Sequence, residues 1–172
     1  MAKKKVPVDT LLKELEECVG ELPNDYKQFI RDGDFSRVPG EEGVSFDALE
    51  PTPFGGGVLE FFLDPDPQGM AYFEDAEMLA IGSNGFDYPT CISLGKADRG
   101  SIYYYDHQQR ALWPDEQFRS MFSNLAPGIE SYLAQRKAGT LPSKPEELTC
   151  FFKIANNFSE FLERCEPMPA EE

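Results

Sequence analysis

Positive charge is the first thing that this chain of 172 residues lacks. Its 16 lysines and arginines face 31 aspartates and glutamates, which gives a formal net charge of −15 at pH 7. Between Val38 and Gly95 there is no lysine or arginine at all. Proteins hold nucleic-acid phosphates and anionic membrane surfaces chiefly through these two residue types. The composition therefore argues against nucleic acid or a membrane as the direct partner.

Acidic residues fill the span that has no cations. They are the following 11: Glu41, Glu42, Asp47, Glu50, Glu60, Asp64, Asp66, Glu74, Asp75, Glu77 and Asp87. One interpretation is a solvated face that keeps the chain in solution. The other is a docking surface for a basic partner, because complementary charge speeds association. The sequence leaves both open. The residues that we predict for such a partner-binding surface are Asp64, Asp66, Glu74, Asp75, Asp87 and Tyr88.

Histidine is nearly absent, since His107 is the only one in the chain. A Ser-His-Asp or Cys-His arrangement would have to use it. Its neighbour Asp106 follows a predicted strand, in which consecutive side chains point to opposite faces. Asp106 is therefore poorly placed to orient the imidazole. We predict that the chain is not an enzyme and has no catalytic residues.

Patterns of metal ligands are missing as well. The four cysteines are far apart and show no Cys-x-x-Cys spacing. The segment from Asp64 to Asp75 partly follows the spacing of a calcium-binding EF-hand loop, but Gln68 is the wrong ligand type and two prolines stiffen the loop. We predict no metal site and no cofactor.

Long apolar runs are absent too. No stretch approaches the roughly 20 apolar residues of a membrane span. The basic start, Lys3 to Lys5, is not followed by the apolar segment of a secretory signal. We therefore expect a cytoplasmic protein.

What the chain does have is a clear hairpin signal in its middle. Residues 90–94 and 101–105 are rich in branched and aromatic side chains, which suit a pleated, half-buried surface. The short polar loop between them has a glycine at each end, Gly95 and Gly100. Because Ser101 to Tyr105 carries bulky side chains on both faces, we predict a central strand that is covered on both sides.

The remaining pattern predicts a single α+β domain over residues 1–172, with a central, largely antiparallel sheet and helices at both chain ends. Helices are predicted at 10–19, 23–32, 115–125, 127–139 and 158–165, the last one capped by Asn157. Strands are predicted at 44–49, 58–63, 71–73, 78–82 and, as a short one, 111–113. Residues 148–155 fit a strand or a helix. Residues 111–149 are predicted to be a helical insertion before the C-terminal helix, and 167–172 a frayed tail.

Three short motifs follow one another in the middle of the chain. They are Ile81-Gly82 with Gly85, the strand Cys91 to Leu94 followed by Asp98-Arg99-Gly100, and the aromatic run from Tyr103 that ends in Asp106-His107. In this order they resemble the SUKH superfamily, which includes fungal regulators of cell-wall synthesis and many bacterial immunity proteins. Residues 22–29 and 158–162 resemble its early and closing helices. The resemblance does not cover 111–149, and residues 31–34 depart from the family's usual Asn-Gly-Gly.

The resemblance implies a binding module. It implies an immunity protein that binds a cognate bacterial toxin and neutralises it by masking its surface. Many toxins of such systems are basic nucleases that act in the cytoplasm, which agrees with an acidic docking surface. The alternative is a regulatory scaffold of the same superfamily that binds cellular proteins and has no toxin as partner.

Overall fold

A six-stranded antiparallel sheet forms the centre of the protein, within residues 6–33 and 42–169, which the computed structural model describes. Its strands are β3 (Phe61–Phe62), β4 (Tyr72–Phe73), β5 (Met78–Ser83), β6 (Thr90–Ser93), β7 (Ile102–Tyr105) and β8 (Phe151–Ala155). The order is β3-β5-β6-β7-β8, and β4 pairs with β5 as well. The predicted central strand is confirmed, because β7 lies between β6 and β8.

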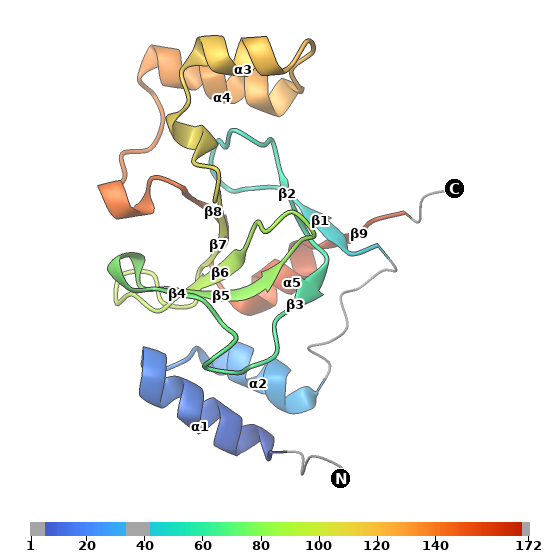
Figure 1. Ribbon diagram of the computed structural model, residues 1–172, viewed down its shortest axis with the longest axis vertical. Coiled ribbons are helices and arrows are strands. Elements are labelled where there is room, and N and C mark those ends of the chain that lie inside the picture. Colours follow the sequence, from blue (N-terminus) through green and yellow to red (C-terminus); the bar gives the residue numbers. More distant parts are fainter. Residues whose placement is uncertain (1–5, 34–41, 170–172) are drawn as a thin grey trace.

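A second, smaller sheet lies beside the first (Figure 1). Its three antiparallel strands are β2 (Gly57–Leu59), β1 (Val44–Phe46) and β9 (Glu166–Pro167), in this order. β1 is the middle strand and is shorter than the predicted 44–49. Of the predicted frayed tail, residues 170–172 lie outside the described part of the chain, and the N–H of Met168 donates to the carbonyl of Gly43 at 3.0 Å.

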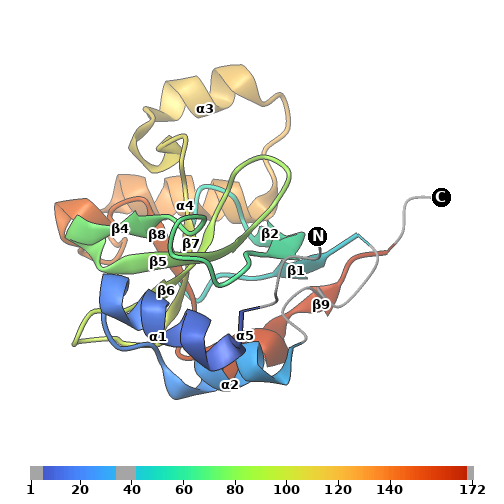
Figure 2. The ribbon, with the colours of Figure 1, turned by 60° about the horizontal axis from the view of Figure 1, so that its bottom comes forward.

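Helices cover the sheets at both ends. The α-helices are α1 (Val8–Val19), α2 (Asn24–Asp32), α3 (Asp115–Met121), α4 (Pro127–Ala138) and α5 (Phe158–Arg164). Three 3₁₀ turns lie in the connections: η1 (Glu74–Ala76) between β4 and β5, η2 (Arg110–Leu112) between β7 and α3, and η3 (Glu146–Leu148) between α4 and β8. Figures 1 and 2 both place α1 and α2 on the opposite side of the large sheet from α3.

The closing helix α5 begins as predicted. The side-chain oxygen of Asn157 accepts a hydrogen bond of 2.8 Å from the N–H of Glu160, which satisfies one of the free N–H groups at the helix start. Phe158 and Phe161 are fully buried, and the Phe161 ring packs against that of Phe46. α5 therefore joins the small sheet to the core of the large one.

The segment 111–149 is helical, as predicted, and has an apolar cluster of its own. Phe118 of α3 and Leu133 of α4 are buried with Phe152 of β8. Pro127 occupies the first turn of α4, where its missing N–H costs nothing. The helical pair therefore sits on the β8 side of the large sheet.

Two sequence predictions are wrong. Residues 58–63 do not form one strand, because the chain leaves the small sheet after Leu59 and enters the large one at Phe61. Leu59 is fully buried, and the space that it fills exists because Gly82 has no side chain: a Cβ there would lie 2.4 Å from the Leu59 Cδ1 atom. Residues 111–113 are not a strand either, since η2 covers 110–112. The ambiguous segment 148–155 contains the strand β8.

Candidate functional site: an acidic groove beside the large sheet

The polar residues of the central motifs hold the fold together. One carboxylate oxygen of Asp98 accepts a hydrogen bond from the Ser93 hydroxyl and the other accepts one from the Tyr103 hydroxyl, both at 2.6 Å. Arg99 donates to the carbonyl and the carboxylate of Glu21, each at 3.2 Å. These contacts fix the β6–β7 hairpin and tie it to the α1–α2 connection. They leave these side chains engaged within the protein rather than directed at a ligand.

Asp106 is a fully buried charge at the end of β7. Its Oδ2 atom accepts a hydrogen bond of 2.9 Å from the N–H of Ala111, which closes the turn before η2. Its Oδ1 lies 3.9 Å from the Nε atom of Arg110, whose guanidinium stacks 3.8 Å above the Phe54 ring. Burial raises the pKa of Asp106, and the hydrogen bond from Ala111 and the attraction of Arg110 oppose this only in part.

The structure does not assemble a catalytic pair around His107. The hydrogen-bonded and charged partners of Asp106 are Ala111 and Arg110 rather than His107. The imidazole packs edge-on against the ring of Tyr88, with ring centroids 4.3 Å apart. This arrangement gives the histidine no carboxylate to orient it as a general base.

A groove of about 470 Å³ opens beside β4 and β7. Its floor is aromatic: the rings of Phe73, Tyr105 and Phe151 pack on one another with centroids 4.7 to 5.4 Å apart. Phe73 and Tyr105 remain partly exposed, and Leu112 of η2, which lines the same groove, is 59% exposed. The groove therefore offers apolar and aromatic surface to whatever occupies it.

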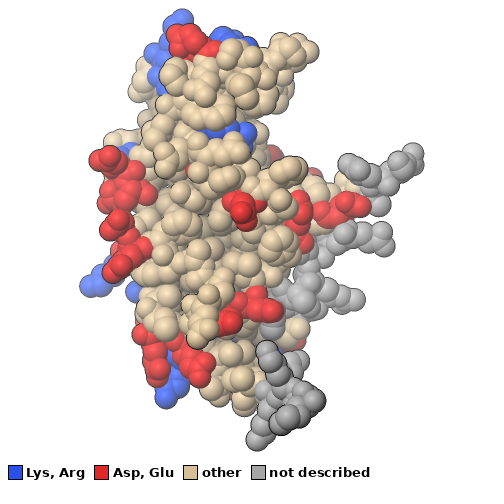
Figure 3. Space-filling model, viewed as in Figure 1, with Lys and Arg blue, Asp and Glu red and all other residues tan. Residues whose placement is uncertain are grey.

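Carboxylates line both walls of this groove. Glu74 and Asp75 of η1 and Glu146 and Glu147 of η3 line the groove, and we call these two neighbouring turns its walls. Among the described residues none of the four forms an ion pair. In Figure 3 acidic side chains form a band along the left edge of the protein, over η3 and η1 as Figure 1 places them. We call these four carboxylates with their aromatic floor the acidic groove.

The surroundings of the acidic groove are acidic as well. A smaller hollow next to it is lined by Asp75, Glu77, Asp98 and Glu147, with Lys96 as the one cation in its lining. Cys150 also lines the groove, and burial raises the pKa of its thiol. A thiol with a raised pKa stays protonated near neutral pH and is a poor nucleophile. The groove is thus suited to binding a cation rather than to thiolate chemistry.

The structure distributes the six predicted partner-binding residues over three loops. Glu74 and Asp75 line the acidic groove. Asp64 and Asp66 lie in the loop between β3 and β4, where the Asp66 carboxylate accepts a hydrogen bond from the N–H of Gln68. Asp87 and Tyr88 lie in the loop between β5 and β6; Asp87 is exposed, whereas Tyr88 is only 7% exposed.

Sequence reasoning missed the second wall of the groove. Glu146 and Glu147 lie outside the cation-free span on which the prediction was based, and Leu112 was assigned to a strand. One signal was available: Pro145 is followed by two adjacent acids, Glu146 and Glu147, shortly before the apolar residues of β8. Nothing in the sequence shows that η1 and η3 meet.

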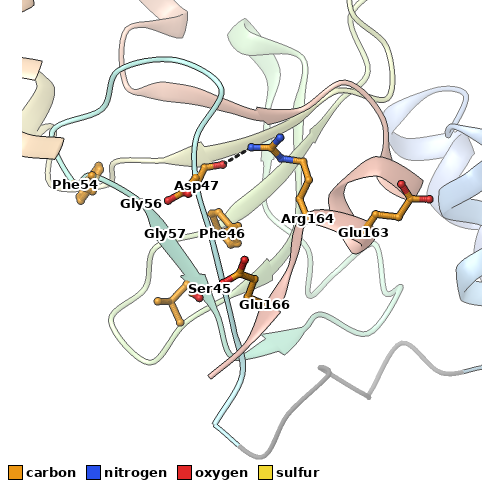
Figure 4. A pocket seen from close by; sticks show the side chains of 11 residues that line it. Ser45, Phe46, Asp47, Phe54, Gly56, Gly57, Glu163, Arg164 and Glu166 are labelled. Atoms are coloured by element: carbon orange, nitrogen blue, oxygen red, sulfur yellow. Dashed lines mark hydrogen bonds between the residues drawn. The ribbon is translucent and has the colours of Figure 1, made fainter. Parts of the chain in front are cut away.

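A second cavity, larger than the groove, lies between the small sheet and α5 (Figure 4) and measures about 580 Å³. It is lined by the glycines 55–57 together with Asp47, Glu163, Arg164 and Glu166. The Arg164 guanidinium donates to the backbone carbonyl of Asp47 at 3.1 Å, which ties the end of α5 to the segment after β1. The lining contains both acids and an arginine, so the cavity has no single sign of charge. The lining contains neither histidine nor cysteine, so it offers no nucleophile–base pair.

Two further searches concern the described residues 6–33 and 42–169. No helix there is long and apolar enough to cross a bilayer. No group of three or more His, Cys, Asp or Glu side chains in that part of the chain is arranged to hold a metal ion.

Comparison with known proteins gives one match. The family model described as SMI1 / KNR4 family (SUKH-1) matches residues 9–135. The match includes η1 and extends through α3 into α4, so it reaches into the segment 111–149 that the motif resemblance left out. It ends before η3 and α5. No curated protein and no solved structure matches the chain.

Proposed function

Because the chain belongs to the SMI1 / KNR4 family (SUKH-1), we propose that it is an immunity protein that binds a cognate toxin and masks its surface. In this proposal the protein is a cytoplasmic binding module, and it acts without catalysis, cofactor or metal. The partner is a basic protein, such as a nuclease, whose cationic cleft the acidic surface covers. Family membership supports the class of function, and the acidic groove supports the chemistry of the partner.

The acidic groove is the observation that carries this proposal. Four carboxylates without ion-pair partners among the described residues surround an aromatic floor. A Lys or Arg side chain entering the groove would meet opposite charge on both walls and an aromatic face below. Cation–π contact contributes roughly 0.5–2 kcal/mol, depending on how fully the cation is desolvated. Removing one partner of a desolvated charge pair at an interface costs roughly 2–5 kcal/mol, in part because the other charge is left unpaired.

The two walls differ in their relation to the family. Glu74 and Asp75 lie within the matched residues 9–135, whereas Glu146 and Glu147 lie beyond them. The proposed binding surface thus combines an element of the family region with one that the family model does not include. This suggests that η3 helps to select the particular toxin.

The test uses a two-residue charge reversal, Glu74→Lys with Glu147→Lys, which places one cation on each wall. The immunity proposal expects a toxin-like reading frame beside the gene for this chain, and its product, inactivated at its own active site, is the probe. We expect the reversal to weaken Kd by at least about 100-fold and to slow association, with the largest loss at low salt. Binding kinetics at two salt concentrations measure both effects.

The matched control reverses two exposed acids outside the groove, Glu14→Lys with Glu116→Lys. It changes the net charge by the same amount, so it separates the groove from overall charge. A control that weakens binding as much as the groove variant would show that only net charge matters. If the unsubstituted chain does not bind the neighbouring product at all, the regulatory scaffold becomes the better hypothesis.

A further inference from the structure

The loop between β5 and β6 carries the most exposed large apolar side chain of the described residues, since Phe86 is 77% exposed. An exposed phenylalanine side chain does not stabilise the fold, because the stabilisation comes from burying its apolar ring. Large aromatic side chains at the surface are typical anchors of protein–protein interfaces.

Phe86 stands on a turn that the interior of the protein fixes. Asn84 is buried, and its side-chain oxygen accepts hydrogen bonds from the N–H groups of Phe86 and Tyr88 at 3.0 and 3.1 Å. The Asn84 carbonyl accepts a third bond of 3.1 Å from the N–H of Asp87, which adopts a positive φ of 61°. Three hydrogen bonds to one residue hold the tip in a single shape.

The turn is supported from below by aromatic side chains. The amide nitrogen of Asn84 lies within 3.4 Å of the Tyr104 hydroxyl, to which it donates, and the rings of Tyr88 and Tyr104 are stacked with centroids 5.8 Å apart. Tyr104 belongs to the central strand β7. A loop that is fixed in this way loses little conformational entropy when a partner binds it, which favours affinity.

Acidic side chains and a second aromatic residue lie around the tip. Phe61, on the edge strand β3 opposite Ser83, is 44% exposed at the end of β5 from which the loop leaves. A Cβ added at Gly85 would lie 3.1 Å from a carboxylate oxygen of Glu60, so this carboxylate sits beside the loop. Asp87 is exposed next to Phe86. The surface therefore has an apolar centre and an acidic rim.

The charge of the rim decides between two occupants. A second copy of this chain would bring the same acids, and a formal net charge of −15, against Glu60 and Asp87. Like charges directly opposed across an interface cost several kcal/mol. A partner that offers an apolar pocket edged by lysine or arginine satisfies the phenylalanine and both acids at once.

The acidic groove and the Phe86 loop lie at the two ends of the same strand, β5. η1, on one wall of the groove, directly precedes the start of β5, and the Phe86 loop follows its end. A six-residue strand is about 20 Å long. An interface of standard size covers about 800 Å² on each partner, a patch roughly 30 Å across.

We propose that Phe86, with Phe61 beside it and Glu60 and Asp87 as its rim, is a second contact surface that inserts into an apolar, basic-edged pocket of the partner. The inference rests on the proposed function for the identity of that partner, which is the same basic toxin. The groove supplies charge for association, and the tip supplies an apolar anchor that slows dissociation.

The experiment compares Phe86→Ala with Met121→Ala in binding to the inactivated product of the neighbouring toxin-like reading frame. Met121 is 62% exposed on α3 and serves as the matched apolar control. We expect Phe86→Ala to weaken Kd by at least about 10-fold, mainly through faster dissociation, and Met121→Ala to leave Kd unchanged. Neither substitution should lower the thermal midpoint, because both side chains are exposed.

The outcomes separate this inference from the proposed function. If Phe86→Ala binds as tightly as the unsubstituted chain while the Glu74→Lys, Glu147→Lys variant binds weakly, the tip is not a contact and the proposed function stands. If the unsubstituted chain does not bind the probe, both fail. A dimer of the unsubstituted chain in sedimentation, dissolved by Phe86→Ala, would identify a second copy as the occupant and overturn the inference.

Discussion

Asp106 is fully buried, and its ion-pair partner Arg110 is held at a distance. Its Oδ1 atom is 3.9 Å from Arg110 and has no hydrogen-bond partner among the described residues, whereas its Oδ2 closes a turn through Ala111. A buried carboxylate without full compensation is costly in its charged form. This explains why its pKa is raised, with burial as the main cause.

A pH dependence of stability follows from this shift. The folded pKa of Asp106 lies above its ordinary value of 3.8, so between these two values the folded state binds more protons than the unfolded state. Its contribution to the free energy of unfolding therefore decreases as pH rises through that interval and is constant above it. In Asp106→Asn, which cannot titrate there, this decrease should be absent.

Chemical unfolding of both proteins over a series of pH values measures the effect as a difference, which cancels the titration of the other acids. We expect the stability of the native chain relative to Asp106→Asn to be highest at the acidic end of the series. A relative stability that rises with pH would mean that the Ala111 hydrogen bond and Arg110 together outweigh burial.

At the scale of elements, the crossing of the chain from the small sheet to the large one depends on Gly82. The buried Leu59 side chain occupies the position where a Gly82 side chain would stand. A Cβ at this position would also lie 2.8 Å from the carbonyl oxygen of Phe61, a backbone atom that cannot easily move. The short motif Ile81-Gly82 thus allows β2 and β3 to belong to different sheets.

Gly82→Ala should therefore destabilise the protein by about 1–3 kcal/mol through overpacking. Gly69→Ala is the matched control, because a Cβ at Gly69 would meet its nearest neighbours at 3.8 Å, an ordinary contact distance. Denaturant midpoints of the two variants provide the comparison. Equal midpoints would contradict the account of how the chain changes sheets.

The elements that sequence reasoning predicts correctly are those whose signals are local. The cap at Asn157 and the glycines of the β6–β7 hairpin act within a few residues, and they predict α5 and β7 well. The break at Glu60 depends on Gly82, more than 20 residues away, so the apolar run 58–63 gives no sign of it. The candidate site follows the same rule: its first wall lies in an evident acidic span, but its second wall is brought there by tertiary packing of η3.

For the whole molecule, the exposed charge and apolar surface lie apart from the contacts that hold the fold together. The central motifs form contacts within the fold, whereas the exposed carboxylates of the acidic groove and the exposed ring of Phe86 form none. His107 packs against Tyr88, and no carboxylate among the described residues orients it. In the proposed function, such an acidic surface neutralises a basic partner by occupying it, one molecule for one.

Stoichiometry tests this central claim most directly. The toxin's own activity is measured while increasing amounts of the chain are added, at concentrations well above Kd. The account predicts a linear loss of activity that is complete at one molar equivalent, does not progress with time, and is the same for a stably folded His107→Ala variant. Time-dependent loss of all activity at a small fraction of an equivalent, abolished by His107→Ala, would show turnover and contradict masking by binding.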